Sequence, residues 1–141
     1  MKRMAAAAVL VCAAGVGLAH AQDRAQFDGV APVTHTVEMV LKEGRYAFEP
    51  KEVKAKAGDR VVFVMASGGP HNVAFDPATI PADQKDQLWA NMPGSMDGSS
   101  PIFTDPNQEW TLSIGNIAPG KYPFHCTPHL AMNMKGEITV Q

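Results

Sequence analysis

The sequence predicts an all-β fold, a Greek-key β-sandwich or small barrel of about eight short strands with one short helix. Three observations predict it: apolar and polar residues alternate in short runs, Gly, Pro and Asp interrupt these runs, and only residues 76–91 have helical character. The chain has 141 residues, 45% of them apolar and 18% charged. This length and composition are typical of a single globular domain.

The first half of the domain contains four predicted strands. Val37 and Met39 alternate with polar neighbours in the first, and the fourth is nearly continuous in β-branched and aromatic residues, which indicates a central strand. Turns rich in Gly, Pro and Asp separate the four. The predicted strands cover residues 34–41, 46–48, 53–57 and 60–65.

The second half begins with a loop of small residues that leads to His71 and a short predicted strand at residues 72–75. Residues 76–91 are the helical candidate, a turn or two long because Pro77 and Pro81 limit its start. Residues 92–107 are rich in Gly, Ser and Pro and are expected to form a loop. Met92 and Met96 belong to this loop, and we expect them only to cap an edge of the packed core. The last predicted strands cover residues 109–114, 121–126 and 136–141.

The first 21 residues have the pattern of a secretory signal peptide. Lys2 and Arg3 precede an apolar run that ends at a small-x-small cleavage site, Ala19-His20-Ala21. A membrane anchor is the alternative, but the run is short for a span, and Val11 argues against lipid attachment at Cys12. We therefore expect a signal peptide at 1–21, a flexible leader at 22–33, a domain at 34–141 and a periplasmic location.

Cleavage would leave Cys126 as the only cysteine and lower the basic side chains from 12 to 10, against 14 acidic ones, a net charge of −4. This mildly acidic balance makes nucleic acid an unsuitable partner. A lone thiol in an oxidising compartment forms no disulfide within its own chain. Cys126 is therefore paired between chains, catalytic, or held by a metal.

The loop that follows Cys126 favours the metal. It places His129 and two thioethers, Met132 and Met134, within eight residues of the thiol, and His71 adds a second imidazole from upstream. One thiolate, two imidazoles and a weak thioether are the ligands of a blue-copper electron-transfer centre. Strand periodicity points Cys126 inward and His125 outward, so we expect His125 to be a surface histidine outside the site.

Five short motifs carry a resemblance to a known family. They are Pro70-His71-Asn72-Val73-Ala74-Phe75-Asp76, Tyr122-x-Phe124-x-Cys126, Cys126-Thr127-Pro128-His129 followed by Met134-Lys135-Gly136, Phe48-Glu49-Pro50 and Lys56-Ala57-Gly58-Asp59. From about Val37 onward the chain resembles the plastocyanin family of small blue (type 1) copper proteins, the cupredoxins.

The resemblance implies a cupredoxin-like fold and one type 1 copper ion that cycles between Cu(I) and Cu(II). His71, Cys126 and His129 would form a near-trigonal ligand set, and Met134 a long axial contact. Met132 is the competitor for the axial position, since relatives with shorter ligand loops have Met at its spacing. Those relatives place the axial Met directly before x-Gly and the last strand, which Met134 satisfies.

Two further roles follow from the resemblance. Asn72 matches a residue whose side chain ties the two ligand loops together and whose N–H reaches the Cys126 sulfur. Pro128 has no N–H, so a second bond to the sulfur from that position is absent.

The small or apolar residues around His129, among them Gly69, Pro70, Leu130 and Ala131, form a candidate docking patch.

The sequence thus predicts an exported, monomeric electron carrier rather than an enzyme. It would have no substrate, and its partners would be redox proteins such as c-type cytochromes or membrane electron-transfer complexes. The main alternative is a periplasmic copper-trafficking protein, which its several Met residues would suit. A third possibility, a Cys–His thiol enzyme, needs an activated thiolate in a cleft, and neither a helix dipole nor a substrate pocket is evident near Cys126.

Overall fold

The computed structural model describes residues 31–141. The predicted signal peptide at 1–21, Cys12 and the leader up to residue 30 lie outside the described residues. Residues 31–33 are exposed and precede the first strand without regular secondary structure. Among residues 31–141, no helix is both long enough and apolar enough to cross a lipid bilayer.

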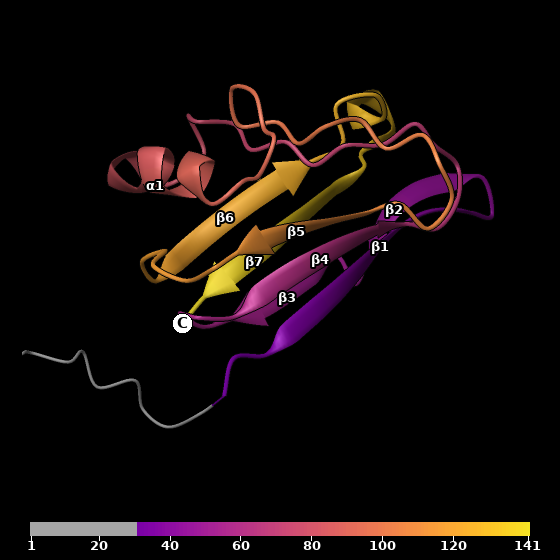
Figure 1. The fold of residues 1–141 in the computed structure, drawn as a ribbon. Helices are drawn as coiled ribbons and strands as arrows, with labels where there is room; N and C mark the ends of the chain where they lie inside the picture. The colour runs from indigo at the N-terminus through magenta and orange to yellow at the C-terminus, as the bar shows by residue number, and fades with distance from the viewer. Residues whose placement is uncertain (1–30) are drawn as a thin grey trace, which may run out of the picture. The chain divides into compact units, whose positions relative to one another are not determined.

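Within residues 31–141, seven strands in two sheets make up the fold (Figure 1). One sheet has the order β2-β1-β4-β5 and the other β3-β7-β6. The strands are β1 (Thr34–Lys42), β2 (Arg45–Glu49), β3 (Glu52–Ala55), β4 (Arg60–Met65), β5 (Glu109–Ser113), β6 (Gly120–His125) and β7 (Lys135–Val140). The predicted all-β class is confirmed, with strand boundaries within a few residues of those expected.

Two of the pairings, β1 with β4 and β3 with β7, are parallel, whereas the others are antiparallel. Strands that pair in parallel cannot be joined by a tight hairpin. The chain therefore passes between the sheets, and strands distant in sequence become neighbours. Figure 1 shows β6 leading into the coil of η2 (Leu130–Met132), from which the chain turns back into β7.

An aromatic cluster joins the two sheets. Phe48 of β2 and Phe63 of β4 pack edge-on against Phe124 of β6, with ring centroids 4.8 and 5.3 Å away. All three are buried, and edge-to-face pairs add roughly 0.5–1.5 kcal/mol each beyond area burial. Side chains two residues apart on a strand face the same side of the sheet. Because the ring of Phe124 is fixed in the interior, the side chain of Cys126 points into the interior as well.

The segment 72–75 does not form the strand that the sequence predicted. Its backbone bonds go to two separate segments: Ala74 exchanges two bonds with His125, whereas Phe75 donates to the carbonyl of Gly98 and the carbonyl of Val73 accepts from Ser100. A ladder of strand hydrogen bonds needs one continuous partner strand. Here the partners are spread over β6 and the loop at residues 91–108 that precedes β5. The segment is nevertheless buried along its whole length.

The helical candidate forms a 3₁₀ turn, η1 (Ala82–Gln84), and one short helix, α1 (Lys85–Ala90). Leu88 is its buried residue, whereas Asp83 and Asp86 are exposed. The loop at residues 92–107 is tied to the domain by two contacts. Met92 is buried, and Trp110 donates its indole N–H to the carbonyl of Pro93 at 2.8 Å, whereas Met96 is exposed.

Candidate metal centre

Three side chains from two separate loops meet at the end of the sandwich where β6 stops. The Sγ atom of Cys126 lies 3.6 Å from Nδ1 of His71 and 3.4 Å from Nδ1 of His129. Their candidate ligand atoms all lie within 4.8 Å of one another, and all three residues are buried. Of the described residues, these form the one group of three or more His, Cys, Asp or Glu with metal-ligand spacing.

The loop from Cys126 to Met134 closes on itself. The N–H of His129 donates to the carbonyl of Cys126, and η2 ends at Asn133, whose φ of 62° is left-handed. Cys126 then donates to the carbonyl of Met134 at 3.1 Å, and Met134 donates to His129 at 3.3 Å. This closure brings Met134 back to the buried site, fully enclosed, and leaves Met132 on the surface with 54% exposure.

His71 is oriented by the backbone that delivers it. Its N–H donates to the carbonyl of Phe103, and its ring Nε2 lies 2.8 Å from the carbonyl of Ser67. A carbonyl only accepts, so Nε2 carries the proton and the lone pair is on Nδ1, which faces the sulfur. Burial lowers the pKa of His71, against the opposing effect of the bond to Ser67, so the ring is neutral near pH 7.

Asn72 joins the two loops that carry the candidate ligands. Its Oδ1 accepts from the N–H of Thr127 at 2.7 Å, and its Nδ2 donates to Oγ1 of Thr127 at 3.2 Å and to Oγ of Ser99 at 2.8 Å. One buried amide thus ties together the His71 segment, the Cys126 loop and the 91–108 loop. It fixes the separation of residues that lie far apart in the sequence.

Burial raises the pKa of the Cys126 thiol, and the backbone N–H groups of Asn72 and His129 act in the opposite direction. The bond from Asn72 was expected. The contribution of His129 was not. Burial, together with the neighbouring His71, also lowers the pKa of His129.

This donor set fits copper. Each neutral imidazole has one unprotonated nitrogen, and the Nδ1 atoms of both rings face a sulfur that a bound metal ion would ionise. A soft thiolate with two imidazoles and a thioether suits copper better than the hard oxygen ligands that Mg²⁺ or Ca²⁺ require. The site is also enclosed: the side chains of Cys126 and Met134 have no exposed surface.

The remaining candidate residues lie around this centre. Gly69, Pro70, Leu130 and Ala131 are all exposed, as a docking patch requires, and Pro128 is exposed as well. His125 is half-buried rather than on the open surface. It lines a shallow hollow of about 260 Å³ with Asp76, Leu130 and Lys135, and it lies outside the group of converging ligand atoms.

The sequence reasoning missed two contacts of the histidines. One is the Ser67 carbonyl, which no side-chain pattern reveals. The other is Tyr46, whose ring stacks on that of His129 with centroids 3.7 Å apart and planes 12° from parallel. The available signal was strand periodicity, since Tyr46 lies two residues before the buried Phe48 and so faces the same side.

Comparison with known proteins gives a consistent result. The family model described as "Copper binding proteins, plastocyanin/azurin family" matches residues 35–141. Plastocyanin of Prochlorothrix hollandica is 36% identical over 108 residues, covering 75% of this chain and 73% of that one. Plastocyanin of Nostoc punctiforme is 34% identical over 108 residues, covering 77% and 74%.

Solved structures agree with this similarity. The oxidised form of plastocyanin from Dryopteris crassirhizoma superposes with a TM-score of 0.60 at 33% identity, covering 75% of this chain and 99% of that one. A Sinorhizobium pseudoazurin has a TM-score of 0.52 at 32% identity, covering 77% and 74%. The match of family model, relatives and fold, around a converging Cys–His–His group, shows that this chain belongs to the plastocyanin/azurin family of copper-binding proteins.

Proposed function

We propose that the protein is a blue-copper electron carrier in which His71, Cys126, His129 and Met134 hold one copper ion. The observation that carries this proposal is the convergence of Cys126 Sγ on the Nδ1 atoms of two buried histidines, at 3.4 and 3.6 Å. Bound copper supplies one-electron chemistry through Cu(I) and Cu(II). All four ligands are side chains of this one chain.

The chain's own contribution is a rigid frame. Asn72 fixes the distance between the ligand loops, Ser67 orients His71, and the closed Cys126–Met134 loop holds the remaining ligands. Ligands held by packing and hydrogen bonds move little when the charge of the metal changes. Such a frame favours fast electron exchange over substrate chemistry, and we propose that the protein is not an enzyme.

Electrons would enter and leave through His129. This residue is buried except for a 6% exposed edge, and the exposed small or apolar residues Gly69, Pro70, Leu130 and Ala131 are close in sequence to the two histidines. An uncharged patch suits brief contacts, because it can be desolvated at low cost. We propose that redox proteins such as c-type cytochromes or membrane electron-transfer complexes dock there.

Copper trafficking is the less favoured alternative. A carrier that hands over its metal needs ligands that a partner can reach, whereas the Cys126 thiol has no exposed surface. The same burial argues against a thiol enzyme, whose nucleophile must meet a substrate. The exposed Met132 and Met96 are the soft groups that a trafficking role would use.

The location follows from the first residues of the sequence. Lys2, Arg3 and the apolar run that ends at Ala21 support cleavage of residues 1–21 and export to the periplasm. We propose that cleavage leaves a flexible leader at 22–33 followed by the copper domain at 34–141, and that the protein acts as a monomer.

The visible spectrum of the mature chain reconstituted with Cu(II) tests the ligand assignment. We expect an intense blue absorption from the Cys126–copper bond, its bleaching by a mild reductant, and its loss in Cys126→Ser. A colourless product without thiolate bonding would overturn the proposal. Stopped-flow reduction by a c-type cytochrome then tests the choice of partner separately.

A further inference from the structure

The two histidine rings of the site are held in different ways. The ring of His71 is fixed by the Ser67 carbonyl on its far nitrogen, Nε2. Within residues 31–141, the His129 ring makes one polar contact, between its Nδ1 and the Sγ of Cys126. Nothing comparable to the Ser67 carbonyl fixes the rotation of the His129 ring, although an Nδ1 ligand must keep its lone pair aimed at the metal.

Tyr46 lies where such a restraint would be needed. Its ring is stacked on the His129 ring at 3.7 Å and 12°, and it meets the His71 ring edge-on at 6.2 Å and 73°. Parallel stacking covers one face of the imidazole and opposes rotation about its χ2 axis. No hydrogen bond to the Tyr46 hydroxyl occurs within residues 31–141, so the ring acts through its face.

The β1–β2 hairpin holds Tyr46 in place. Glu43 and Gly44 both have positive φ, at 51° and 76°, which is the backbone geometry of a two-residue type I′ turn. The register then pairs Leu41 with Tyr46. Two residues later the same face of β2 carries Phe48 into the aromatic cluster. The ring that touches His129 is therefore anchored to the core of the sandwich.

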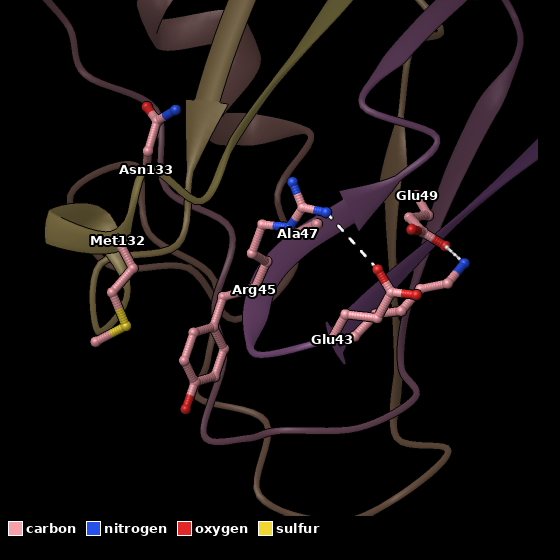
Figure 2. Close-up of a pocket in the computed structure, with 8 residues that line it drawn as sticks. Glu43, Arg45, Ala47, Glu49, Met132 and Asn133 are labelled. Carbon is pink, nitrogen blue, oxygen red and sulfur yellow. Dashed lines mark ion pairs between the residues drawn. The ribbon is translucent and has the colours of Figure 1, made fainter.

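The other side of Tyr46 is open. It lines a hollow of about 440 Å³ between the hairpin and the end of the ligand loop (Figure 2). Figure 2 shows Met132 and Asn133 on the loop side of this hollow and Arg45 and Ala47 on the hairpin side. Tyr46 is only half-buried there, so filling the core does not by itself require an aromatic ring at this position.

We propose that Tyr46 is a positioning residue for His129, whose stacked ring holds the imidazole with Nδ1 facing the Cys126 sulfur before and after the metal changes charge. The inference rests on the proposed function, in that it takes His129 as a copper ligand. It adds a contact from the first hairpin, so that the site depends on three segments of the chain, around residues 46, 71 and 126–134.

The role requires the ring and not the hydroxyl, which gives a matched pair of variants. Tyr46→Phe keeps the stack, and Tyr46→Leu removes it while keeping apolar bulk. Groups that orient a metal-bound histidine typically contribute about 10–100-fold to metal affinity. We therefore expect Tyr46→Leu to bind copper about tenfold more weakly, to alter its electron paramagnetic resonance spectrum and to slow electron self-exchange, whereas Tyr46→Phe retains wild-type values.

The control is Arg45→Gln, which changes the neighbouring side chain of the same hollow without touching His129. It should leave copper affinity, spectrum and self-exchange as in the wild type. Equal copper affinity and spectra for Tyr46→Leu and Tyr46→Phe would overturn the inference. A wild-type protein that never turns blue would instead count against the proposed function.

A measurement on the metal-free wild type keeps the inference testable if Tyr46→Leu fails to fold. A ring 3.7 Å away shifts the His129 ring protons upfield in the proton NMR spectrum. We expect this shift in the wild type and in Tyr46→Phe. His129 protons at ordinary positions in the folded, metal-free wild type would overturn the stack and the role built on it.

Discussion

The side-chain oxygen of Asn72 accepts a hydrogen bond from the backbone N–H of Thr127 at 2.7 Å, and this bond joins the segment that carries His71 to the loop that carries Cys126. The two residues are 55 positions apart. Because each is next to a candidate ligand, a change in their separation moves one ligand against the other.

Replacing Asn72 should therefore loosen the metal site. Asn72→Ala leaves the partly buried N–H of Thr127 without its acceptor, which typically costs about 1–3 kcal/mol. We expect the free energy of unfolding of the metal-free protein to fall by that amount, and copper to bind about 10–100-fold more weakly. Urea denaturation and competition with a copper chelator measure the two effects.

Asn116 offers a control for this prediction. It is an exposed Asn that accepts a hydrogen bond from Asn91 at 3.2 Å, so Asn116→Ala should change both quantities little. Equal effects of the two substitutions would show that the bond between the ligand loops has no special weight.

The two methionines of the ligand loop should differ sharply. Met134 is fully buried beside the site, whereas Met132 is 54% exposed. Met134→Leu should change the visible spectrum and the reduction potential because it removes an axial thioether. Met132→Leu keeps bulk on the surface and should leave both as in the wild type. The opposite pattern would move the axial assignment to Met132.

The docking patch can be tested without disturbing the copper. Leu130 is 42% exposed next to His129, and Leu130→Glu would bury a charge when a partner docks, which is costly. We expect the second-order rate constant of reduction by a c-type cytochrome to fall about tenfold, with an unchanged visible spectrum. Val33→Glu, an exposed site just before β1, is the control, and an equal loss there would argue against a patch around His129.

In the described part of the chain, the buried carboxylate of Asp59 should make the free energy of unfolding depend on pH. Burial by itself raises the pKa of Asp59, but bonds from His35, Val33 and Lys56 outweigh it and hold the pKa well below its ordinary value of 3.8. Since the folded state binds the proton less tightly than the unfolded state, this stabilisation is complete above the unfolded pKa. It is lost progressively as the pH falls below about 4.

Asp59→Asn measures that contribution. At pH 7 the variant loses a charge that accepts several hydrogen bonds, so we expect it to be about 2 kcal/mol less stable. The difference from the wild type should narrow as the pH is lowered from 4 towards 2. Urea denaturation of the metal-free proteins across this range measures it, and a constant difference would exclude the linkage to Asp59.

The fold class and three of the candidate ligands were predictable because their signals are local. Alternation of apolar residues predicts most strands, and Cys126, His129 and Met134 belong to one short loop. No spacing rule connects His71 to the loop, so its inclusion depended on its residue type and on the resemblance to a known family. The choice of Met134 over Met132 is consistent with their burial.

What the sequence could not reveal depends on distant pairing. Residues 72–75 have the composition of a strand, but their partners are scattered over β6 and the 91–108 loop, so no ladder forms. The ring of His35 lies 3.0 Å from the buried Asp59, a partner 24 positions away that no local pattern predicts. Tyr46 reads as an ordinary strand residue until the hairpin register places it on His129.

The parallel pairings of β1 with β4 and of β3 with β7 have a consequence for the reactive sulfur. Such non-local pairings give a high contact order, and proteins of this kind fold in roughly milliseconds to seconds rather than microseconds. Until the last of these pairings forms, the Cys126 thiol is open to oxidation and to thiol–disulfide exchange. The speed of folding therefore decides how much of the newly made protein reaches the native state with its sulfur still able to take up metal.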